Sequence, residues 1–385
     1  MPPTPNAPVI RCDVPGSFAR AVFHERHPAL LRQVLAALPY GPAQRAALRR
    51  LLAESTSGEL TPPDPHWPDH ARWLAWGAGM WGRPWGEAPF LWAESWFYRR
   101  LLDATGYFRP GAWQGVDPFA PFKSAELAGP AVDAELAALA TLPEDGRADA
   151  LLTSALWGNR ADLSFRITAG TDDGPTTGGL LVDDRAVLWD ALAAAAGGRV
   201  CVVADNAGPE LLPDLLLIDH LLAHGSVGSA VLFVKPQPYF VSDATMADVL
   251  ATLERLRAAP GPTGARLRRA LADGTLEVRT HPFFCAPLPY HDLPADLRAE
   301  FAGAAMTILK GDLNYRRLVG DRHWPATTPF ADTAAHFPSP VTALRTLKSE
   351  VAVGLPAPLA ARLDRTDPTW RTGGHHAVIQ SHPTT

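Results

Sequence analysis

The chain has 385 residues, a formal net charge of −5 and 47% hydrophobic residues, which is typical of a soluble globular protein with room for two domains. Without a basic excess a nucleic-acid partner is not expected, and no apolar run reaches the length of a transmembrane helix. Three cysteines without paired spacing predict neither a disulfide framework nor a zinc site, and the N-terminus lacks a signal-peptide pattern, so we expect a cytoplasmic protein.

The first part of the chain is predicted to be helical. Residues 17–56 and 70–104 carry apolar residues three to four positions apart, as one face of a helix requires. A proline-rich connection at 61–69 separates them, and residues 131–142 form a further Ala/Leu helical pattern. Because no convincing strand pattern precedes residue 150, the sequence predicts an all-helical N-terminal region over 1–150.

The pattern changes after residue 150, where short apolar runs rich in Val, Leu and Ile alternate with helical stretches. These runs are residues 179–184, 199–206, 229–236, 276–284 and 306–314. Continuous apolar strands separated by helices are typical of a mostly parallel sheet covered on both faces. Residues 151–385 are therefore predicted to form a three-layer α/β/α domain.

Three of the predicted strands end in polar residues. Asp205 and Asn206 follow one strand, Lys235 follows the next, and Asp312 follows a third. Ligands of open α/β sheets bind outside the carboxyl ends of the strands, and carboxylate and amide oxygens suit Mg²⁺ or Mn²⁺. The alternative is structural: Asp205 and Asn206 would cap the following helix, and Asp312 would be a turn residue.

Basic residues offer candidate phosphate ligands. Lys235 ends a strand, and Arg345 and Lys348 share one face if their segment is helical. The alternative for the latter pair is an ordinary solvated basic face. Asn159 and Asp162 lie in a polar loop after a helix, where capping is the competing interpretation.

Several longer segments occur in an order that resembles a known family. They are ESWFYRRLL (94–102), DPFAPFK (117–123), WGNRADLS (157–164), DNAGPELLPDLLL (205–217), VKPQPYFVSD (234–243), ILKGDLNYRRLVGD (308–321) and LRTLKSEVAVGL (344–355). Together they resemble the metal-dependent damage-control phosphatases, in the branch with a C-terminal RTxK motif, which is also described as protein-glutamate methyltransferases. The resemblance runs from about Trp92 to Ile379.

The resemblance implies a set of site residues. Its metal ligands fall on Asp205, Asn206 and Asp312, and its phosphate and sugar contacts fall on Glu210, Arg345, Thr346 and Lys348. A basic residue expected near the C-terminus is replaced by His375. Asn159 and Asp162 are expected to line the pocket. The implied cofactor is a divalent metal, Mn²⁺ or Mg²⁺, with Co²⁺ and Ni²⁺ as further candidates.

The resemblance implies an enzyme, a phosphatase that hydrolyses sugar phosphates such as the ketose fructose 1-phosphate and so removes reactive metabolites. The nucleophile is either a water activated by the metal or the Asp205 carboxylate itself. Two alternatives stay open: an S-adenosylmethionine-dependent carboxyl methyltransferase, for which no glycine-rich turn follows the first strand, and a non-catalytic sugar-phosphate or metal-binding protein. The sequence leaves the oligomeric state open.

Overall fold

The computed structural model describes residues 7–158 and 179–383 of the chain. The elements before the sheet are α1 (Phe18–Ala21), the π-helix η1 (Val22–Arg26), α2 (His27–Ala37), α3 (Pro42–Ser57), α4 (His70–Trp76), η2 (Trp85–Glu87), α5 (Phe90–Thr105), α6 (Ala120–Leu127), α7 (Pro130–Ala140) and α8 (Arg147–Trp157). No strand is assigned among the described residues before 180, which confirms the predicted helical character of this part.

The seven strands are β1 (Leu180–Asp183), β2 (Arg199–Val203), β3 (Ser229–Val234), β4 (Leu276–Thr280), β5 (Met306–Lys310), β6 (Val341–Thr346) and β7 (Ala377–His382). The helices between them are α10 (Arg185–Ala194), α11 (Leu211–Ala223), α12 (Met246–Ala258), α13 (Thr263–Asp273), η3 (Pro282–Cys285), η4 (Tyr290–Asp292), α14 (Ala295–Ala302), α15 (Gly311–Val319), α16 (Phe330–Ala334) and α17 (Ala357–Thr366). The five predicted strands are all present, and β6 and β7 are additional.

The strands form one sheet in the order β1-β7-β6-β5-β2-β3-β4. All neighbours are parallel except β6 and β7, which pair antiparallel from Val341 with His382 to Thr346 with Ala377. The prediction of a mostly parallel sheet is therefore confirmed. The segment from Arg345 to Lys348 does not form a helix, because Arg345 and Thr346 end strand β6. Nor is Arg345 part of a solvated face, since its side chain is buried.

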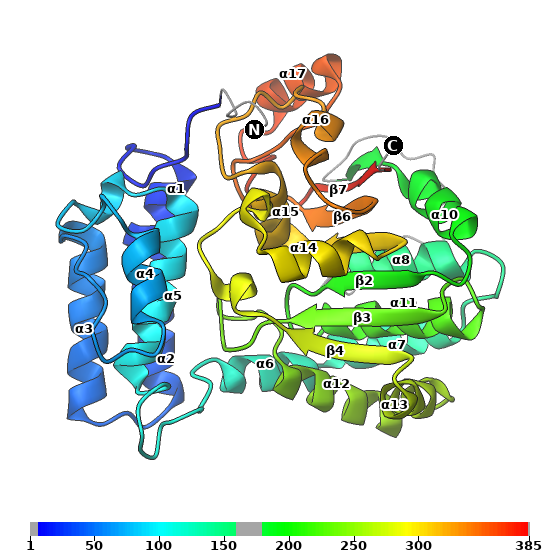
Figure 1. Cartoon of the computed structure of the whole chain (residues 1–385), viewed down its shortest axis with the longest axis horizontal. Helices are drawn as coiled ribbons and strands as arrows, with labels where there is room; N and C mark the ends of the chain where they lie inside the picture. The colour runs from blue at the N-terminus through cyan, green and yellow to red at the C-terminus, as the bar shows by residue number, and fades with distance from the viewer. Residues whose placement is uncertain (1–6, 159–178, 384–385) are drawn as a thin grey trace.

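Alternate side chains of each central strand enter two different cores, which makes the domain three-layered. On β2, Val200 and Val202 belong to a core shared with α8, α10 and α11, whereas Cys201 and Val203 belong to a core shared with α14 and α15. Figure 1 shows α8 and α11 behind the sheet and α14 and α15 in front of it. Because the strands are buried on both sides, their apolar runs are continuous rather than alternating.

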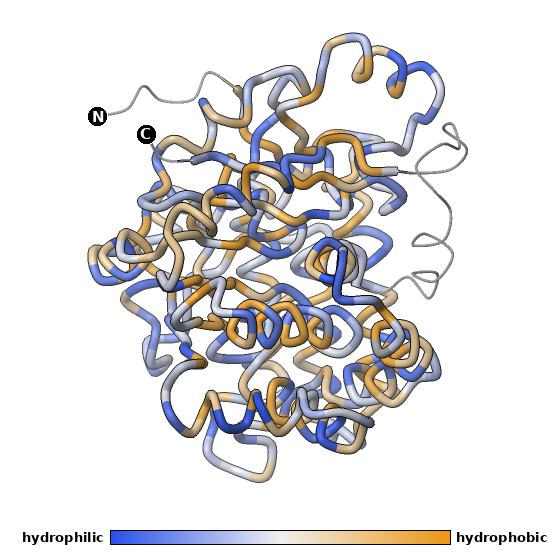
Figure 2. The backbone as a smooth tube through the Cα atoms, turned by 90° about the vertical axis from the view of Figure 1, so that its right-hand side faces the viewer, coloured by the Kyte–Doolittle hydropathy of each residue, from blue (hydrophilic) through white to orange (hydrophobic). Residues whose placement is uncertain are grey.

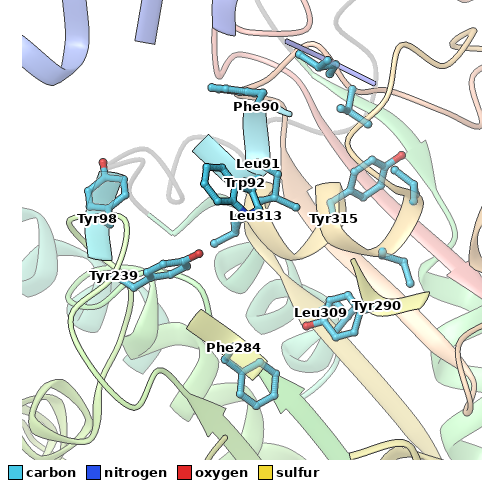
Figure 3. Packing of buried hydrophobic residues seen from close by; sticks show 14 of the residues in the cluster. Phe90, Leu91, Trp92, Tyr98, Tyr239, Phe284, Tyr290, Leu309, Leu313 and Tyr315 are labelled. Atoms are coloured by element: carbon cyan, nitrogen blue, oxygen red, sulfur yellow. The ribbon is translucent and has the colours of Figure 1, made fainter. Parts of the chain in front are cut away.

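Helices α1 to α5 form a separate group, here called the helical cap (residues 18–105). In Figure 1 it stands beyond the ends toward which the arrows of β3 and β4 point. Its contact with the α/β part combines aromatic and polar groups: Tyr98 approaches Tyr239, their ring centroids 6.3 Å apart (Figure 3), and the Tyr239 hydroxyl donates to Ser95 Oγ at 2.6 Å. The cap therefore covers the carboxyl edge of the sheet.

The predicted division at residue 150 falls inside α8. Leu151 and Leu152 of that helix, together with Val132 and Leu139 of α7, belong to the core on the α11 side of the sheet. Apolar stretches of chain run through the interior in Figure 2, with polar residues at many outer turns. Within the described residues, no helix combines the length and the apolar character that crossing a bilayer requires. The division into two domains stays a prediction.

Candidate active site

A cavity of about 350 Å³ lies at the carboxyl edge of the sheet, beneath the helical cap. Asp205 and Asn206 follow β2 after one residue, Ala204, and Asp312 lies in the first turn of α15, immediately after β5. Lys348, on the loop after β6, lines the same cavity. The parallel strands thus bring the three predicted metal ligands and one predicted phosphate ligand to one place, although they are separated by up to 143 positions in the sequence.

The Asp205 carboxylate is buried and packs directly against the backbone of Gly311. A methyl group on Gly311 would overlap with Oδ2 of Asp205, and the φ of Gly311 is +79°, so only glycine fits there. Burial, together with the nearby carboxylates of Asp243 and Glu210, raises the pKa of Asp205 well above its ordinary value. Such a crowded carboxylate is stabilised by a bound cation.

Asn206 connects the residues around Asp205. Its Nδ2 donates to Asp205 Oδ2 at 3.1 Å and to Glu210 Oε2 at 2.8 Å, and its Oδ1 accepts from Ser242 Oγ at 2.6 Å. The loop that carries Ser242 is strained, since Val241 has a φ of +70°, which a β-branched residue rarely adopts. Strain of this kind is concentrated at sites where position matters more than stability.

Asp312 is held through one of its two oxygens. Its Oδ1 accepts from Arg345 Nε at 2.8 Å, from the backbone N–H of Lys348 at 3.2 Å and from Ser349 Oγ at 3.1 Å. Burial alone would raise the pKa of Asp312, but the guanidinium groups of Arg345 and Arg316 and the hydrogen bonds to the carboxylate together hold the pKa below its ordinary value. Within the described part of the chain no hydrogen bond reaches Oδ2, which leaves that oxygen for a ligand.

Arg345 does not line the cavity, contrary to the expectation that it clamps phosphate. Its side chain is 1% exposed, and besides Asp312 its Nη2 donates to Ser349 Oγ at 3.0 Å. The guanidinium lies 4.2 Å from the centroid of the Tyr315 ring. Because its donors are directed at protein groups in the interior, Arg345 is placed to fix the orientation of Asp312.

Replacing Arg345 with methionine should therefore weaken metal binding and turnover by about 10- to 100-fold, the usual effect of removing a group that orients a metal ligand. The measurement is the rate of phosphate release as a function of metal concentration. Arg317→Met is the matched control, because Arg317 is equally buried but donates to the carbonyls of Leu288 and Phe283. Unchanged metal dependence in Arg345→Met would contradict this role.

Glu210 faces Lys348 from just outside the lining of the cavity. Lys348 Nζ lies 3.5 Å from Glu210 Oε1, and the carboxylate of Glu210 raises the pKa of Lys348. The Lys348 side chain is 48% exposed, so its ammonium group has room to turn toward an anion. Thr346 ends β6 outside the cavity lining. The backbone of Leu347 bonds to Gly374 and His376, which brings the exposed His375 near Lys348 but not into the lining.

The sequence also predicts Lys235 as a phosphate ligand and Asn159 and Asp162 as residues of the pocket. Lys235 is not available to phosphate: it is 1% exposed and its Nζ lies 3.2 Å from Asp243 Oδ2, so it neutralises a carboxylate of the strained loop. Asn159 and Asp162 lie outside the described residues.

The cap side of the cavity holds residues that the sequence did not point to. Glu94 and Tyr98 of α5 line it, as does Arg26 of η1, and Arg316 of α15 faces them from the α/β part. Glu94 begins one of the segments that carry the family resemblance, yet nothing in its local pattern assigns it a function. Its place depends on a contact between two parts of the chain that are distant in sequence.

The residues present fit a hard divalent cation. Asp205 sits in a cradle that a Cβ would fill, Asp312 presents an oxygen without a hydrogen bond in the described structure, and Asn206 adds an amide oxygen. No cluster of three or more His, Cys, Asp or Glu side chains suited to a metal occurs in residues 7–158 and 179–383, and this set has only two carboxylates. Oxygen ligands of mixed type are what Mg²⁺ and Mn²⁺ prefer.

The chain is similar to known proteins in both sequence and fold. Residues 22–363 match the damage-control phosphatase ARMT1-like domain. The chain is 33% identical over 334 residues to damage-control phosphatase ARMT1 of Danio rerio, covering 77% of this chain and 74% of that protein. It is 32% identical over 336 residues to that of Homo sapiens, covering 77% and 75%.

The fold matches a crystal structure of a DUF89 family protein from Pyrococcus horikoshii with a TM-score of 0.53 and 16% identity, covering 94% of this chain and 97% of that chain. At that identity the likeness concerns the fold alone. The family match and the curated relatives together span most of the chain, including every described residue of the cavity that follows Val22. The chain therefore belongs to the ARMT1-like damage-control phosphatase family, and it is a phosphatase enzyme.

Proposed function

We propose that this phosphatase hydrolyses small sugar phosphates, ketose phosphates such as fructose 1-phosphate among them, with a divalent cation, Mn²⁺ or Mg²⁺, held by Asp205, Asn206 and Asp312. The proposal places it in the cytoplasm, without a nucleic-acid or membrane partner. The observation that supports it is that these three oxygen donors and Lys348 line one cavity.

The side chains of the cavity have different roles in the proposed reaction. A bound cation would polarise a phosphoryl oxygen and lower the pKa of a water molecule. Asp205 is fixed by its contact with Gly311, and Asp312 by Arg345, so neither has to reorganise when substrate binds. Lys348 can exchange its contact with Glu210 for one with the substrate phosphate, because it is half-exposed. Thr346 and His375 stay predicted substrate contacts.

The size of the cavity supports a small substrate. Its volume of about 350 Å³ lies at the lower end of the range for small-molecule sites. A monosaccharide phosphate fits such a volume, whereas a dinucleotide requires more. The methyltransferase alternative gains no support from the relatives, whose names are those of phosphatases.

The test is phosphate release from a panel of ketose and aldose phosphates, with EDTA, Mg²⁺, Mn²⁺, Co²⁺ and Ni²⁺ in separate arms. We expect release only with metal, and faster release from ketose phosphates. Calorimetric titration with S-adenosylmethionine, in metal-free buffer, serves as the control for methyl transfer and should show no binding. Absence of release with every metal would overturn the proposal and favour a binding protein.

A further inference from the structure

Glu94 lies close to the predicted metal ligands although the helical cap carries it. The residue lines the cavity from α5, and its Oε2 accepts from Arg316 Nη1 at 2.8 Å. Arg316 follows Asp312 by four positions on α15, so the two side chains are neighbours on one helix face. Arg316, Glu94 and Asp312 therefore line the same cavity, and Arg316 forms an ion pair with Glu94.

The charges around Arg316 do not balance if both of its acidic partners are ionised. Asp321 accepts from Arg316 Nε at 2.7 Å and from Nη2 at 3.0 Å, and also from the backbone N–H of Leu91 at 3.0 Å. Glu94 receives one hydrogen bond, at Oε2, and in the described residues none reaches its Oε1. All three side chains are less than one tenth exposed. One guanidinium cannot neutralise two buried carboxylates, so the less well bonded of them keeps a proton.

This assignment agrees with the environment of Glu94. Burial raises the pKa of Glu94 to about 7, although the charge of Arg316 opposes the increase. Asp312, with its own guanidinium partner, has a pKa below the ordinary value. Glu94 and Asp312 thus line one cavity, and their environments shift their pKa values in opposite directions. Such pairs are typical of active sites in which one carboxyl group donates a proton and the other stays ionised.

We propose that Glu94 is the general acid of the reaction and donates the proton on Oε1 to the bridging oxygen of the substrate as the phosphorus–oxygen bond breaks. This inference rests on the proposed phosphatase function. The bond between phosphorus and the sugar oxygen breaks, and that oxygen leaves as a hydroxyl with the Glu94 proton. The oxygen of the attacking water bonds to phosphorus, one of its protons stays with the phosphate, and the other returns to Glu94 through solvent.

Other charged groups face the same space and have to be separated from Glu94 in any pH study. On α15 these are Asp312 and Arg316, with Asp321 behind them. The loops after β2, β3 and β6 contribute Asp205, Asp243 and Lys348, and the cap contributes Arg26, His27 and Tyr98. His27 and Tyr98 do not titrate near neutral pH, because burial lowers the pKa of His27 to about 3 and raises that of Tyr98 well above its ordinary value. Burial also raises the pKa values of Asp205 and Asp243, so the variants have to distinguish these carboxyl groups from Glu94. A transition near neutral pH belongs to Glu94 if Glu94→Gln removes it and Asp321→Asn keeps it.

The test compares two substrates that differ in their need for an acid. A sugar phosphate releases a strongly basic alkoxide, whereas p-nitrophenyl phosphate releases a stable phenolate that leaves without a proton. Glu94→Gln keeps the size and the acceptor for Arg316 but has no dissociable proton. We expect it to lose about 10²- to 10⁴-fold in kcat/KM on the sugar phosphate, and less than about tenfold on p-nitrophenyl phosphate. Equal losses on both substrates would overturn the proposal.

Asp321→Asn is the matched control, because Asp321 contacts the same guanidinium but does not line the cavity. Damage to the Arg316 network alone should reduce both substrates alike. In the wild type the sugar-phosphate rate should fall as pH rises through about 7, since the acid must be protonated, and Glu94→Gln should lack this limb.

An infrared difference spectrum of the two proteins at pH 6 provides a readout that needs no turnover. We expect a protonated carboxyl band in the wild type that is absent from Glu94→Gln. Its absence from the wild type would overturn the general-acid role even in an active enzyme. A wild type that shows the band but hydrolyses neither substrate would instead overturn the phosphatase proposal on which this inference depends.

Discussion

Replacing Asp205 with asparagine should abolish metal-dependent phosphate release while leaving the fold intact. The substitution keeps the shape of a buried side chain and removes one of the two negative charges proposed to hold the cation. A loss of about 4 kcal/mol in transition-state stabilisation corresponds to a decrease of roughly 10³-fold in rate, and we expect at least this. Phosphate release at saturating Mn²⁺ measures it. Wild-type turnover in Asp205→Asn would remove Asp205 from the site.

The same substitution should stabilise the metal-free protein. The pKa of Asp205 is raised in the folded state by burial and by Asp243 and Glu210, so the folded state binds more protons than the unfolded state. Stability is therefore lost as pH rises from the ordinary pKa of an aspartate to the raised pKa of Asp205, and at pH 7 Asp205 opposes folding in comparison with an uncharged side chain.

Thermal melting with and without metal separates the two effects. Without metal, Asp205→Asn should melt at a higher temperature than the wild type at pH 7. Metal at 100 times its Kd should stabilise the wild type by about 2.7 kcal/mol and Asp205→Asn by much less. Asp332→Asn, on the exposed surface of α16, is the control and should behave as the wild type does. An equal metal-induced shift in Asp205→Asn would contradict the ligand assignment.

Replacing Gly311 with alanine should inactivate the enzyme from a position that has no functional group. The added methyl overlaps with Oδ2 of Asp205, and the φ of +79° disfavours any L side chain. Either Asp205 moves or the start of α15 moves, and the latter displaces Asp312, the next residue. A displacement of about 1 Å at catalytic groups can reduce the rate by about 10²-fold, and we expect at least this loss in kcat/KM.

Gly274→Ala is a matched control for the backbone effect. Gly274 ends α13 with the same φ of +79°, but a Cβ there meets nothing within 4 Å. It should cost about 1–2 kcal/mol of stability without changing kcat/KM. Chemical denaturation and steady-state kinetics of both variants give the comparison. If Gly311→Ala lost only stability and kept its rate, the contact with Asp205 would not matter for catalysis.

The strands that sequence reasoning found are those whose burial is uniform. The runs that became β2, β3 and β5 are apolar at nearly every position, because helices cover both faces of the sheet. β7 was missed since AVIQSH mixes apolar and polar residues, and the buried Gln380 is accommodated by a hydrogen bond from Tyr315. β6 was missed because its last residues belong to an RTxK motif whose basic pair suggested a helix face.

Only part of the site could be predicted, because some of its contacts join residues that are distant in the sequence. Asp205, Asn206 and Asp312 follow strands, and parallel strands carry such residues to one edge whatever the details of packing. Arg345 was assigned to phosphate because a sequence cannot show that its side chain points inward to Asp312. Glu94 could not be found, since its contact with Arg316 spans 222 positions and leaves no local pattern.

The order of these parts along the chain has a consequence for synthesis. The side of α5 that carries Phe90 and Glu94 contacts Arg316 of α15, which the ribosome adds much later. At about 5–20 residues per second, this surface waits roughly 10–45 s for its partner. We expect the nascent helical cap to need protection by a chaperone during that interval, and the active site to be among the last parts of the molecule to form.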